Sequence, residues 1–513
     1  MIDATKTLVR VAIVALLALG AALPAAAQAR AQDDKLSVEQ RRVLREYAAD
    51  TWQSFVAMTN PATGLTADNI NAATGAVAAY TSPTNIGSYI WSVLAARDLQ
   101  IIKPNEARAR LARTLATLAT MERHEPSGMF YNWYNPATGA KLTSWPTDGN
   151  PINPFLSSVD NGWLAAALIM VTNSIPQLRD EAAAIVDEMN FSCFYDPAAG
   201  LIRGGFWDTN PPPGSWPTGF YCGGGPDVFY TGHHYGTLNT EPRIASYIGI
   251  AKDGIPATHY FKMWRTFPAT CDWSWQEMQP AGVTRTYLGV DVFEGHYTYR
   301  GMNIVPSWGG SMFEALMVPL LVPEEQWGPR SWGVNHPLYV QAQIEHGLEE
   351  ARYGYWGFSP ANNPAGGYRE YGIDPLGMDT NGYTSDQERT SVDYGWADPA
   401  CARPASIPSE YGQGVVTPHA SFLALEFAPE AALENLSNIR ADFDAYGWGG
   451  FYDSINVETG QVAQSYLALD QGMIMAALGN ALRNDRLQHY FTRGQIEQAI
   501  RPILALEEFS AGR

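Results

Sequence analysis

Ser157-Ser158-Val159-Asp160-Asn161-Gly162-Trp163 places an acidic residue at the point where a loop enters a helix. Apolar residues recur at helical spacing from 160 to 174, and Ser157 or Ser158 stands where a side-chain oxygen can cap the first turn. The same order, a loop rich in glycine and aromatic residues followed by a helix, returns along the chain. We therefore predict the fold from this repeated unit.

Helical periodicity is found in about a dozen segments. They are 38–59, 84–101, 104–122, 160–174, 177–190, 240–251, 309–321, 335–351, 417–427, 430–444, 470–483 and 486–507. Asn85 and Thr240 stand at further N-cap positions, and Pro104 suits a first helical turn. No sustained run of alternating strands is present, so we predict an all-α fold.

Long segments rich in Gly, Pro and aromatic residues separate these helices: 60–83, 124–158, 195–236, 266–307 and 353–414. Loops of that length in a compact protein usually carry function. Their alternation with helices predicts a helical barrel whose loops gather at one end. Because no linker or low-complexity tract divides the chain, we expect one domain over residues 30–513.

The first residues predict a cleaved signal peptide over 1–29. Lys6 and Arg10 precede an apolar run from Val11 to Leu23, and small residues follow as far as Ala29. The run is too short to span a bilayer stably, and no later stretch is long and apolar enough to do so. We expect a periplasmic or secreted protein with no membrane association after cleavage.

The net charge and the aromatic content of the chain limit the classes of molecule that it is expected to bind. The formal net charge of -19 argues against nucleic acid and anionic membranes, and it favours a neutral substrate. The chain has 16 Trp and 26 Tyr, whose faces can stack on sugar rings while their polar edges form hydrogen bonds. Large helical cores also use many aromatic residues, so both interpretations stay open.

The sequence predicts neither a cofactor nor a metal ion. It contains no P-loop, no GxGxxG and no HExxH motif, and no GxSxG elbow supports a serine hydrolase. The four cysteines, Cys193, Cys222, Cys271 and Cys401, lack metal-binding spacing. They allow three disulfide pairings in an oxidising compartment, and the sequence does not rank them.

Carboxylates set among glycines and aromatic residues remain, and these are the groups that glycosidases use. One carboxylic acid must protonate the leaving oxygen, and a second carboxylate must activate water or attack the anomeric carbon. Asp160, Glu241 and Glu314 each stand where a loop enters a helix, and 368–374 is a charged aromatic patch. Early-turn acids also serve the helix dipole, so spacing alone leaves both roles open.

Several ordered motifs carry a family resemblance. They are Tyr80-Thr81-Ser82-Pro83-Thr84-Asn85-Ile86-Gly87, Phe130-Tyr131-Asn132-Trp133-Tyr134, Ser158-Val159-Asp160-Asn161-Gly162, Glu241-Pro242-Arg243, Ser307-Trp308-Gly309-Gly310-Ser311-Met312-Phe313-Glu314, Trp356-Gly357-Phe358-Ser359, Val415-Val416-Thr417-Pro418-His419-Ala420 and Tyr466-Leu467-Ala468-Leu469-Asp470-Gln471-Gly472. Together, over about 45–505, they resemble the glycoamylase-type domain of cyclic β-1,2-glucan synthases, which is related to bacterial endo-β-1,2-glucanases.

The resemblance implies an (α/α)6 barrel with a cleft at one end, and hydrolysis or transfer of glucan chains. It also implies that Glu241 and Glu314 line that cleft. The chain departs from the family at Ser359-Pro360, where a glutamate often follows the serine. The long segments 203–236 and 371–414 would reshape the cleft, and with them the linkage that it accepts.

We therefore predict Glu241 as the general acid and Glu314 as the base or nucleophile. Asp160 would bind a sugar hydroxyl or take the place of Glu314. The predicted substrate-binding residues, for a neutral glucan, are Asn85, Tyr131, Trp133, Trp163, Arg243, Trp308, Tyr368, Arg369 and Asp374.

Two other functions stay open. Helical toroids also host polysaccharide lyases, and His233-His234-Tyr235 would supply the base that β-elimination needs. A glucan-binding protein without turnover is the second alternative, and the missing carboxylate after Ser359 favours it.

Overall fold

The computed structural model describes residues 36–268, 276, 278–378, 399–402 and 412–513. The predicted signal peptide lies outside these ranges, as do Cys271 and most of the 371–414 loop. Residues Leu44–Arg513 form one compact unit, and the described residues 36–43 lie outside it, so each part is described by itself. Within the described ranges, none of the helices combines the length and the apolar character needed to cross a bilayer. The single domain predicted over 30–513 stays a prediction.

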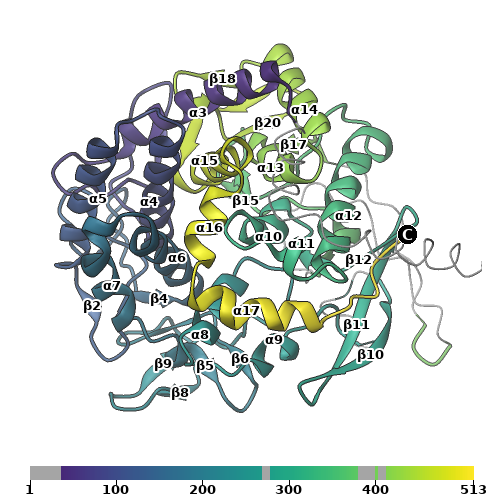
Figure 1. The fold of residues 1–513 in the computed structure, drawn as a ribbon, viewed down its shortest axis with the longest axis horizontal. Helices are drawn as coiled ribbons and strands as arrows, with labels where there is room; N and C mark the ends of the chain where they lie inside the picture. The colour runs from purple at the N-terminus through teal and green to yellow at the C-terminus, as the bar shows by residue number, and fades with distance from the viewer. Residues whose placement is uncertain (1–35, 269–275, 277, 379–398, 403–411) are drawn as a thin grey trace, which may run out of the picture. The chain divides into compact units, whose positions relative to one another are not determined.

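Six helices of the larger unit pack side to side (Figure 1). They are α4 (Pro83–Asp98), α6 (Ser158–Ser174), α8 (Arg243–Ala251), α10 (Met312–Leu316), α13 (Pro418–Leu423) and α15 (Ala468–Arg483). Helix α4 contacts α15 and α6, α6 contacts α8, and α13 contacts α10 and α15. Nearly every residue of α4, α6 and α15 is buried, as expected for helices that are apolar on all sides.

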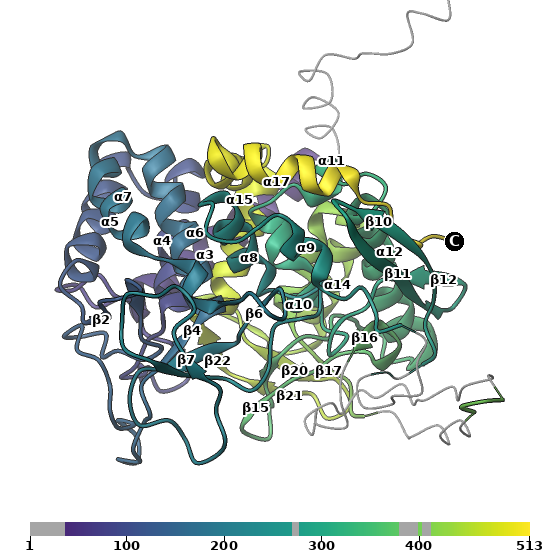
Figure 2. The same cartoon turned by 90° about the horizontal axis from the view of Figure 1, so that it is seen from below.

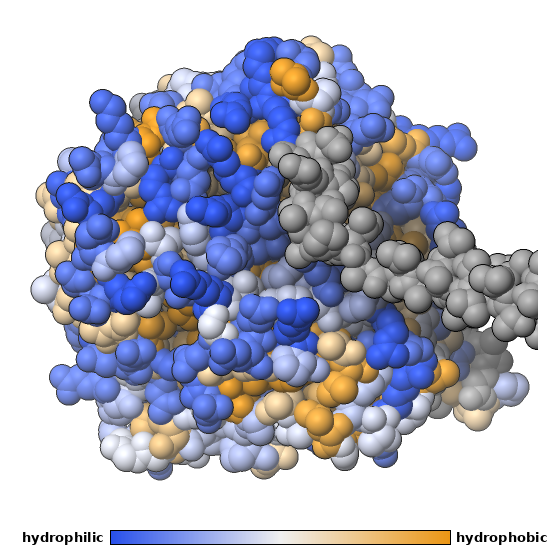
Figure 3. Space-filling model, viewed as in Figure 1, coloured by the Kyte–Doolittle hydropathy of each residue, from blue (hydrophilic) through white to orange (hydrophobic). Residues whose placement is uncertain are grey.

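A second set of helices packs outside these six. It comprises α5 (Pro104–Leu118), α7 (Arg179–Glu188), α12 (Trp332–Glu345), α14 (Pro429–Asp442), α16 (Arg486–Thr492) and α17 (Gln495–Leu506), with the short α9 (Thr258–Lys262) and α11 (Glu324–Trp327). Helix α3 (Val38–Met58) crosses the boundary between the two units. The face that carries α16 and α17 is mostly hydrophilic, with scattered hydrophobic patches (Figure 3). The outer helices thus present polar sides to solvent.

Short strands lie at the opposite end from α17 (Figure 2). Strand β4 (Phe155–Ser157) runs directly into α6, and β22 (Ser465–Leu467) runs into α15 and pairs with β1 (Asn69–Asn71). Strand β4 also begins a four-stranded sheet with β7 (Gly205–Trp207), β9 (Val228–Tyr230) and β8 (Thr218–Gly219), in the order β4-β7-β9-β8. The loops that precede these helices are therefore held by strand pairing.

The remaining strands are brief. They are β2 (Arg123–His124), β3 (Met129–Phe130), β5 (Tyr195–Asp196), β6 (Leu201–Ile202), β13 (Ser307–Trp308), β14 (Ala361–Asn362), β15 (Tyr368–Arg369), β16 (Gly377–Met378), β17 (Val415–Val416), β18 (Tyr446–Gly447), β19 (Gly450–Phe451), β20 (Ser454–Asn456) and β21 (Gln461–Ala463).

Some predicted helix boundaries were wrong for local reasons. The segment 486–507 is two helices, because Gly494 takes a positive φ of 91° between α16 and α17. Helix α10 ends at Leu316, and a 3-10 turn containing Pro319 follows it. Ser82, rather than Asn85, accepts the capping hydrogen bond of α4, whereas Ser157 caps α6 as predicted.

The prediction that no run of strands is present was also wrong. Strands β10 (Ala281–Tyr287) and β11 (Val290–Tyr299) form a hairpin, and β12 (Met302–Ile304) extends it. The two-residue turn Leu288-Gly289 has positive φ at both positions, which matches the twist of a tight hairpin. The alternation is weak because β10 is mostly exposed on both faces.

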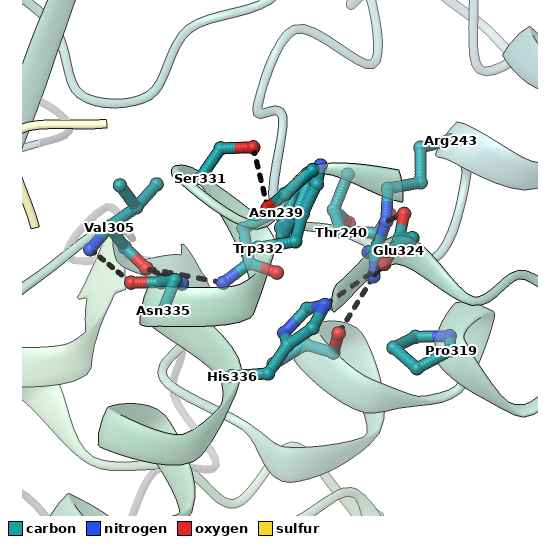
Figure 4. A network of polar contacts seen from close by, with 12 residues as sticks. Asn239, Thr240, Arg243, Val305, Pro319, Glu324, Ser331, Trp332, Asn335 and His336 are labelled. Carbon is teal, nitrogen blue, oxygen red and sulfur yellow. Dashed lines mark hydrogen bonds and ion pairs between the residues drawn. The ribbon is translucent and has the colours of Figure 1, made fainter. Parts of the chain in front are cut away.

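A buried ion pair joins α8 to α11 (Figure 4). Arg243 and Glu324 are both fully buried, and Arg243 Nε and Nη2 lie 2.8 and 2.9 Å from the two Glu324 carboxylate oxygens. Tyr247 donates to Glu324 Oε1 at 2.6 Å, and His336 Nε2 lies 3.0 Å from Oε2. Burial alone would raise the pKa of Glu324, but Arg243 and His336 lower it to about 2. The carboxylate is therefore charged and fully hydrogen-bonded.

A second buried cluster joins the hairpin to the C-terminal segment. The Arg265 guanidinium donates to Glu507, which also accepts from Tyr260. The Nε atom of Arg265 lies 3.6 Å from Glu294 Oε2. The Glu294 carboxyl is fully buried and has no hydrogen-bond partner among the described residues. Burial, together with the charge of Glu507, raises its pKa to about 8 despite Arg265.

We predict that Arg243→Met destabilises the protein by about 3–5 kcal/mol, because it leaves the Glu324 carboxylate buried without its cation. The double variant Arg243→Met with Glu324→Gln should be more stable than the single variant, since no unpaired charge remains. Urea unfolding followed by far-UV circular dichroism measures both. A single variant as stable as the wild type would contradict this account.

We predict that the protein loses stability as pH rises from about 5 to 9, in part through Glu294. A carboxyl whose pKa is raised on folding stabilises the fold fully below its unfolded pKa, and this contribution is lost as pH rises through about 8. Glu294→Gln cannot ionise, so its Tm should fall less over this range. Thermal melts at several pH values test this, with Glu188→Gln, whose side chain is 61% exposed, as the control.

Candidate functional site

Glu241, two residues before the start of α8, lies beside Glu314 in the first turn of α10. Glu314 Oε2 accepts hydrogen bonds from the Thr240 hydroxyl and, at 3.0 Å, from the Glu241 backbone N–H. Ser311 caps α10 by accepting from Glu314 N at 3.2 Å. Both acidic side chains are partly exposed. The two acids predicted from separate motifs therefore lie side by side.

The two carboxyls affect each other's protonation. Burial raises the pKa of Glu241 well above its ordinary value, and the negative charge of Glu314 raises it further. Burial also raises the pKa of Glu314, but its hydrogen bonds from Thr240 and the Glu241 N–H oppose that shift. The shared proton therefore favours Glu241, and Glu314 is the better carboxylate.

In each of the two carboxyls, Oε2 accepts hydrogen bonds from the protein and Oε1 accepts none from the described residues. Trp163 Nε1 donates to Glu241 Oε2 at 2.5 Å, and the hydrogen bonds to Glu314 go to its Oε2. Among the described residues, neither Oε1 atom has a hydrogen bond. In neutral Glu241 the carbonyl oxygen can accept from Trp163 while Oε1 carries the proton. The pair therefore presents one acidic and one basic oxygen.

Asp160 lies close to this pair. Its Oδ1 accepts from the Thr84 hydroxyl at 2.7 Å, and burial raises its pKa. The charge of Asp160 also raises the pKa of Glu241, which places the two carboxyls in one electrostatic environment. Asn85 is buried, and its Nδ2 donates to Asp68 Oδ1 at 2.8 Å.

Four further carboxylates belong to the same neighbourhood: Asp68, Glu370, Asp453 and Asp470. Burial, and after it the charges of Asp470 and Asp160, raise the pKa of Asp68. Burial and then the charge of Glu314 raise the pKa of Glu370 to about 7. Burial and then Asp470 raise the pKa of Asp453. Glu370 and Asp470 lie within motifs that the sequence offers, but no role was predicted for them, and Asp68 and Asp453 were not predicted as site residues. No local motif marks them; only the folded chain brings them together.

Ser359 precedes Pro360, the residue at which the chain departs from the family pattern, and its hydroxyl connects two parts of the site. The Ser359 hydroxyl accepts from Phe313 N at 3.1 Å and lies 2.9 Å from His419 Nε2. His419 Nδ1 lies 3.4 Å from Asp470 Oδ2. A serine here therefore connects the residue before Glu314 to the Asp470 side of the site.

Two predicted substrate-binding roles need correction. Arg243 is fully buried, and its guanidinium donates to Glu324 and to the backbone oxygens of Thr240, Glu314 and Ala315. It positions the acid pair and has no donor directed at a sugar. Trp163 is 1% exposed and packs edge-on against Trp91, so it acts as a hydrogen-bond donor to Glu241 rather than as a stacking surface.

The other predicted binding residues divide by exposure. Tyr131 and Asp374 are buried, and the Tyr131 hydroxyl donates to Asp208 at 2.7 Å. Trp133, Trp308 and Arg369 are partly exposed, and no ion pair or hydrogen bond engages the Arg369 guanidinium within the described residues.

Tyr368 is the most exposed of the predicted binding residues, at 49%. Burial raises the pKa of its phenol, and the negative charges of four carboxylates raise it further: Glu370, Asp470, Asp453 and Glu241. Tyr368 therefore lies among the carboxylates while still presenting surface.

The structure pairs Cys193 with Cys222 in a disulfide, one of the pairings that the sequence left open. Nowhere in the part of the chain that the structure describes do three or more His, Cys, Asp or Glu side chains come together in a way that could hold a metal ion.

Two family models match the sequence. The Glycoamylase model, described as "putative glucoamylase", matches residues 276–495, and a model for a protein family of unknown function, DUF3131, matches residues 46–196. The cyclic β-(1,2)-glucan synthase NdvB of Rhizobium meliloti is 25% identical over 625 residues. The match covers 94% of this chain but 19% of that synthase, so the chain spans about a fifth of the relative's length.

Solved structures share the fold at low identity. An endo-β-1,2-glucanase from Chitinophaga pinensis, in complex with sophorotriose and glucose, has a TM-score of 0.62 at 17% identity, covering 92% of this chain and 98% of that one. An endo-β-1,2-glucanase from Talaromyces funiculosus, in complex with sophorose, has a TM-score of 0.57 at 15% identity, covering 91% and 90%. The resemblance predicted from the ordered motifs is therefore confirmed: the chain carries a glycoamylase-type family match over residues 276–495 and has the helix-rich fold of these glucanases.

Proposed function

We propose that this protein is a glycoside hydrolase that cleaves a neutral glucan, with Glu241 as general acid and Glu314 as the second carboxylate. The observation that carries the proposal is the contact between these two acids. Glu241 lies just before α8 and Glu314 lies in α10, and the pKa of each is raised. Each also keeps one carboxyl oxygen without a hydrogen bond among the described residues.

Glu241 has the properties that a general acid requires. Burial and the negative charge of Glu314 raise its pKa well above that of an ordinary glutamate, which favours the protonated form that a general acid needs. The Trp163 N–H fixes its Oε2, so Oε1 can deliver the proton to the glycosidic oxygen. As the bond to the anomeric carbon breaks, the leaving oxygen takes that proton and Glu241 becomes a carboxylate.

Glu314 has the properties of the partner. Thr240 and the Glu241 N–H stabilise its charged form through Oε2, and Oε1 is left to take a proton from water or to attack the anomeric carbon. Asp160 would bind a sugar hydroxyl, or act as the base in place of Glu314. Hydrolysis and transfer to another sugar both follow from this arrangement, with water or a sugar hydroxyl as the acceptor.

The proposed linkage is β-1,2. Two glucanases with this fold are named for that linkage, and the synthase to which the chain is 25% identical is named for a cyclic β-1,2-glucan. The charge of the site also supports a neutral chain, because clustered carboxylates repel anionic polysaccharides. Sugar hydroxyls can donate to those carboxylates.

We further propose that the six inner helices belong to an (α/α)6 barrel whose loop end forms a substrate cleft. The mutual contacts of α4, α6, α8, α13 and α15 support a ring, and the hydrogen bonds from Arg243 to Glu314 and Ala315 link α8 to α10. Tyr368, Trp308 and Trp133 are the proposed sugar-stacking surfaces. The Cys193–Cys222 disulfide supports the proposed export to an oxidising compartment.

The alternatives fit less well. A lyase would need Tyr235 or a neighbouring histidine as base, but burial and the charges of Glu241, Asp160 and Glu314 raise the pKa of Tyr235, which opposes its ionisation. His234 Nε2 is hydrogen-bonded to Asp196 Oδ2 at 3.0 Å. A binding protein without turnover would not need an acid pair with opposed protonation. New reducing ends released from a glucan panel, without unsaturated products, would separate hydrolysis from both alternatives.

We predict that Glu241→Gln and Glu314→Gln each lower kcat/KM on linear β-1,2-glucan by about 100-fold or more, because each removes one partner of the acid/base pair. Reducing-end release and product sizes measure this, and circular dichroism checks folding. Glu188→Gln, on the surface of α7, is the matched control. If both site variants kept full activity, the assignment of the acids would be wrong.

We also predict a pH effect of Glu314 on Glu241. Activity needs protonated Glu241, so kcat/KM should fall as pH rises through its raised pKa. Glu314→Gln removes a negative neighbour, so the alkaline limb of the residual activity should move to lower pH. Burial, the larger cause, should keep that limb above the range of an ordinary glutamate. An unchanged or higher limb would contradict the coupling.

A further inference from the structure

The four-stranded sheet β4-β7-β9-β8 has an aromatic outer face. Phe155 on β4 pairs with Trp207 on β7, and Trp207 pairs in turn with Phe229 on β9. All three side chains are partly exposed. Because side chains alternate along a strand, these three share one face of the sheet.

The inner face of the same sheet is an ordinary core. Leu156, Phe206 and Tyr230 alternate with the outer residues and are fully buried. An antiparallel sheet with one face on the core usually carries polar residues on the other. Packing against the protein therefore explains the inner residues and not the outer aromatic ones.

The outer rings form a continuous row. The ring centroids of Phe155 and Trp207 are 4.7 Å apart, and those of Trp207 and Trp216 are 4.9 Å apart. The Trp216 indole N–H donates to the Pro212 carbonyl at 2.6 Å, which fixes its ring within the loop before β8. Three aromatic side chains thus line up across strands and loop.

A disulfide and a hydrogen bond restrain the sheet that carries this row. The Cys193–Cys222 disulfide anchors the connection between β8 and β9, and the Tyr230 hydroxyl donates to the Cys193 carbonyl at 2.6 Å. Rigid aromatic surfaces lose little entropy when they bind. The arrangement is therefore suited to binding rather than to filling space.

One end of the row lies close in sequence to the acid site. Strand β4 ends at Ser157, whose side chain caps α6, and Asp160 lies in the first turn of that helix. Asp160 lies five positions after Phe155, so their Cα atoms are at most about 18 Å apart even in an extended chain. A sugar chain whose scissile bond lay at Glu241 and Glu314 could therefore continue over these rings.

We propose that Phe155, Trp207 and Trp216 form an accessory sugar-binding surface that holds glucose units of the glucan chain beyond the cleaved bond. The proposal rests on the proposed glucan hydrolase function. Aromatic faces pair with the C–H faces of sugar rings, and a neutral chain is not repelled by the acidic protein. The surface would make the enzyme favour long chains over short ones.

The test compares Trp207→Ala and Trp216→Ala with the wild type on a long linear β-1,2-glucan and on the shortest oligosaccharide that the enzyme cleaves. We expect KM for the long glucan to rise about tenfold at unchanged kcat, with little change on the short substrate, since one aromatic contact contributes up to about 1.4 kcal/mol. Tyr355→Ala is the matched control, because Tyr355 packs on Phe443 at the end of α14, away from this sheet (Figure 1). Circular dichroism and melting curves establish that each variant folds.

The outcomes separate this proposal from the function on which it rests. Equal KM changes on long and short substrates, or none, would overturn the accessory surface while leaving hydrolysis intact. If no glucan is cleaved, the hydrolase proposal fails, and tryptophan fluorescence titration with the same long glucan still tests the surface. Binding that survives in Trp207→Ala, no glucan binding at all, or dimerisation through this face would overturn it.

Discussion

The buried pair of Arg243 and Glu324 is the constraint on which the site depends. Helix α10 has only five residues, too few to hold a position by its own hydrogen bonds. Arg243 donates to the carbonyls of Glu314 and Ala315 and is itself fixed by Glu324, so it connects the start of α8 to α10 and α11. The position of Glu314 beside the Glu241 N–H follows from that connection. A fully buried ion pair thus sets the geometry of a site whose two acids are partly exposed to solvent.

Much of the fold could be predicted because helix periodicity depends on local sequence. Helices α4, α6 and α15 are apolar over most of their length and fall within a few residues of the predicted segments. The misses have local physical causes. Gly494 and Pro319 break helices that apolar periodicity alone would continue, and the hairpin of β10 and β11 has too exposed a first strand to show a clear alternation. Whether the six inner helices close as a barrel depends on packing that periodicity cannot supply.

The site was predictable where a motif carried it. Glu241, Glu314 and Asp160 each stood at the entrance to a helix, and the structure brings them together. Burial was not predictable, which is why Arg243 and Trp163 seemed to be sugar contacts when they support Glu241 and Glu314 instead. Glu324, Asp68 and Asp453 carry no local signal, because their partners come from distant segments.

The crowding of carboxylates in this site has a chemical consequence. Each added negative charge raises the pKa of its neighbours, so full ionisation of the group is opposed by mutual repulsion. The hydroxyl, amide and indole donors of Thr84, Asn85, Thr240 and Trp163 offset part of that cost. A ligand rich in hydroxyl groups can offset more by donating to the remaining oxygens, whereas an anionic ligand adds to the repulsion. The feature that keeps a proton on Glu241 is therefore the same feature that would select an uncharged sugar chain.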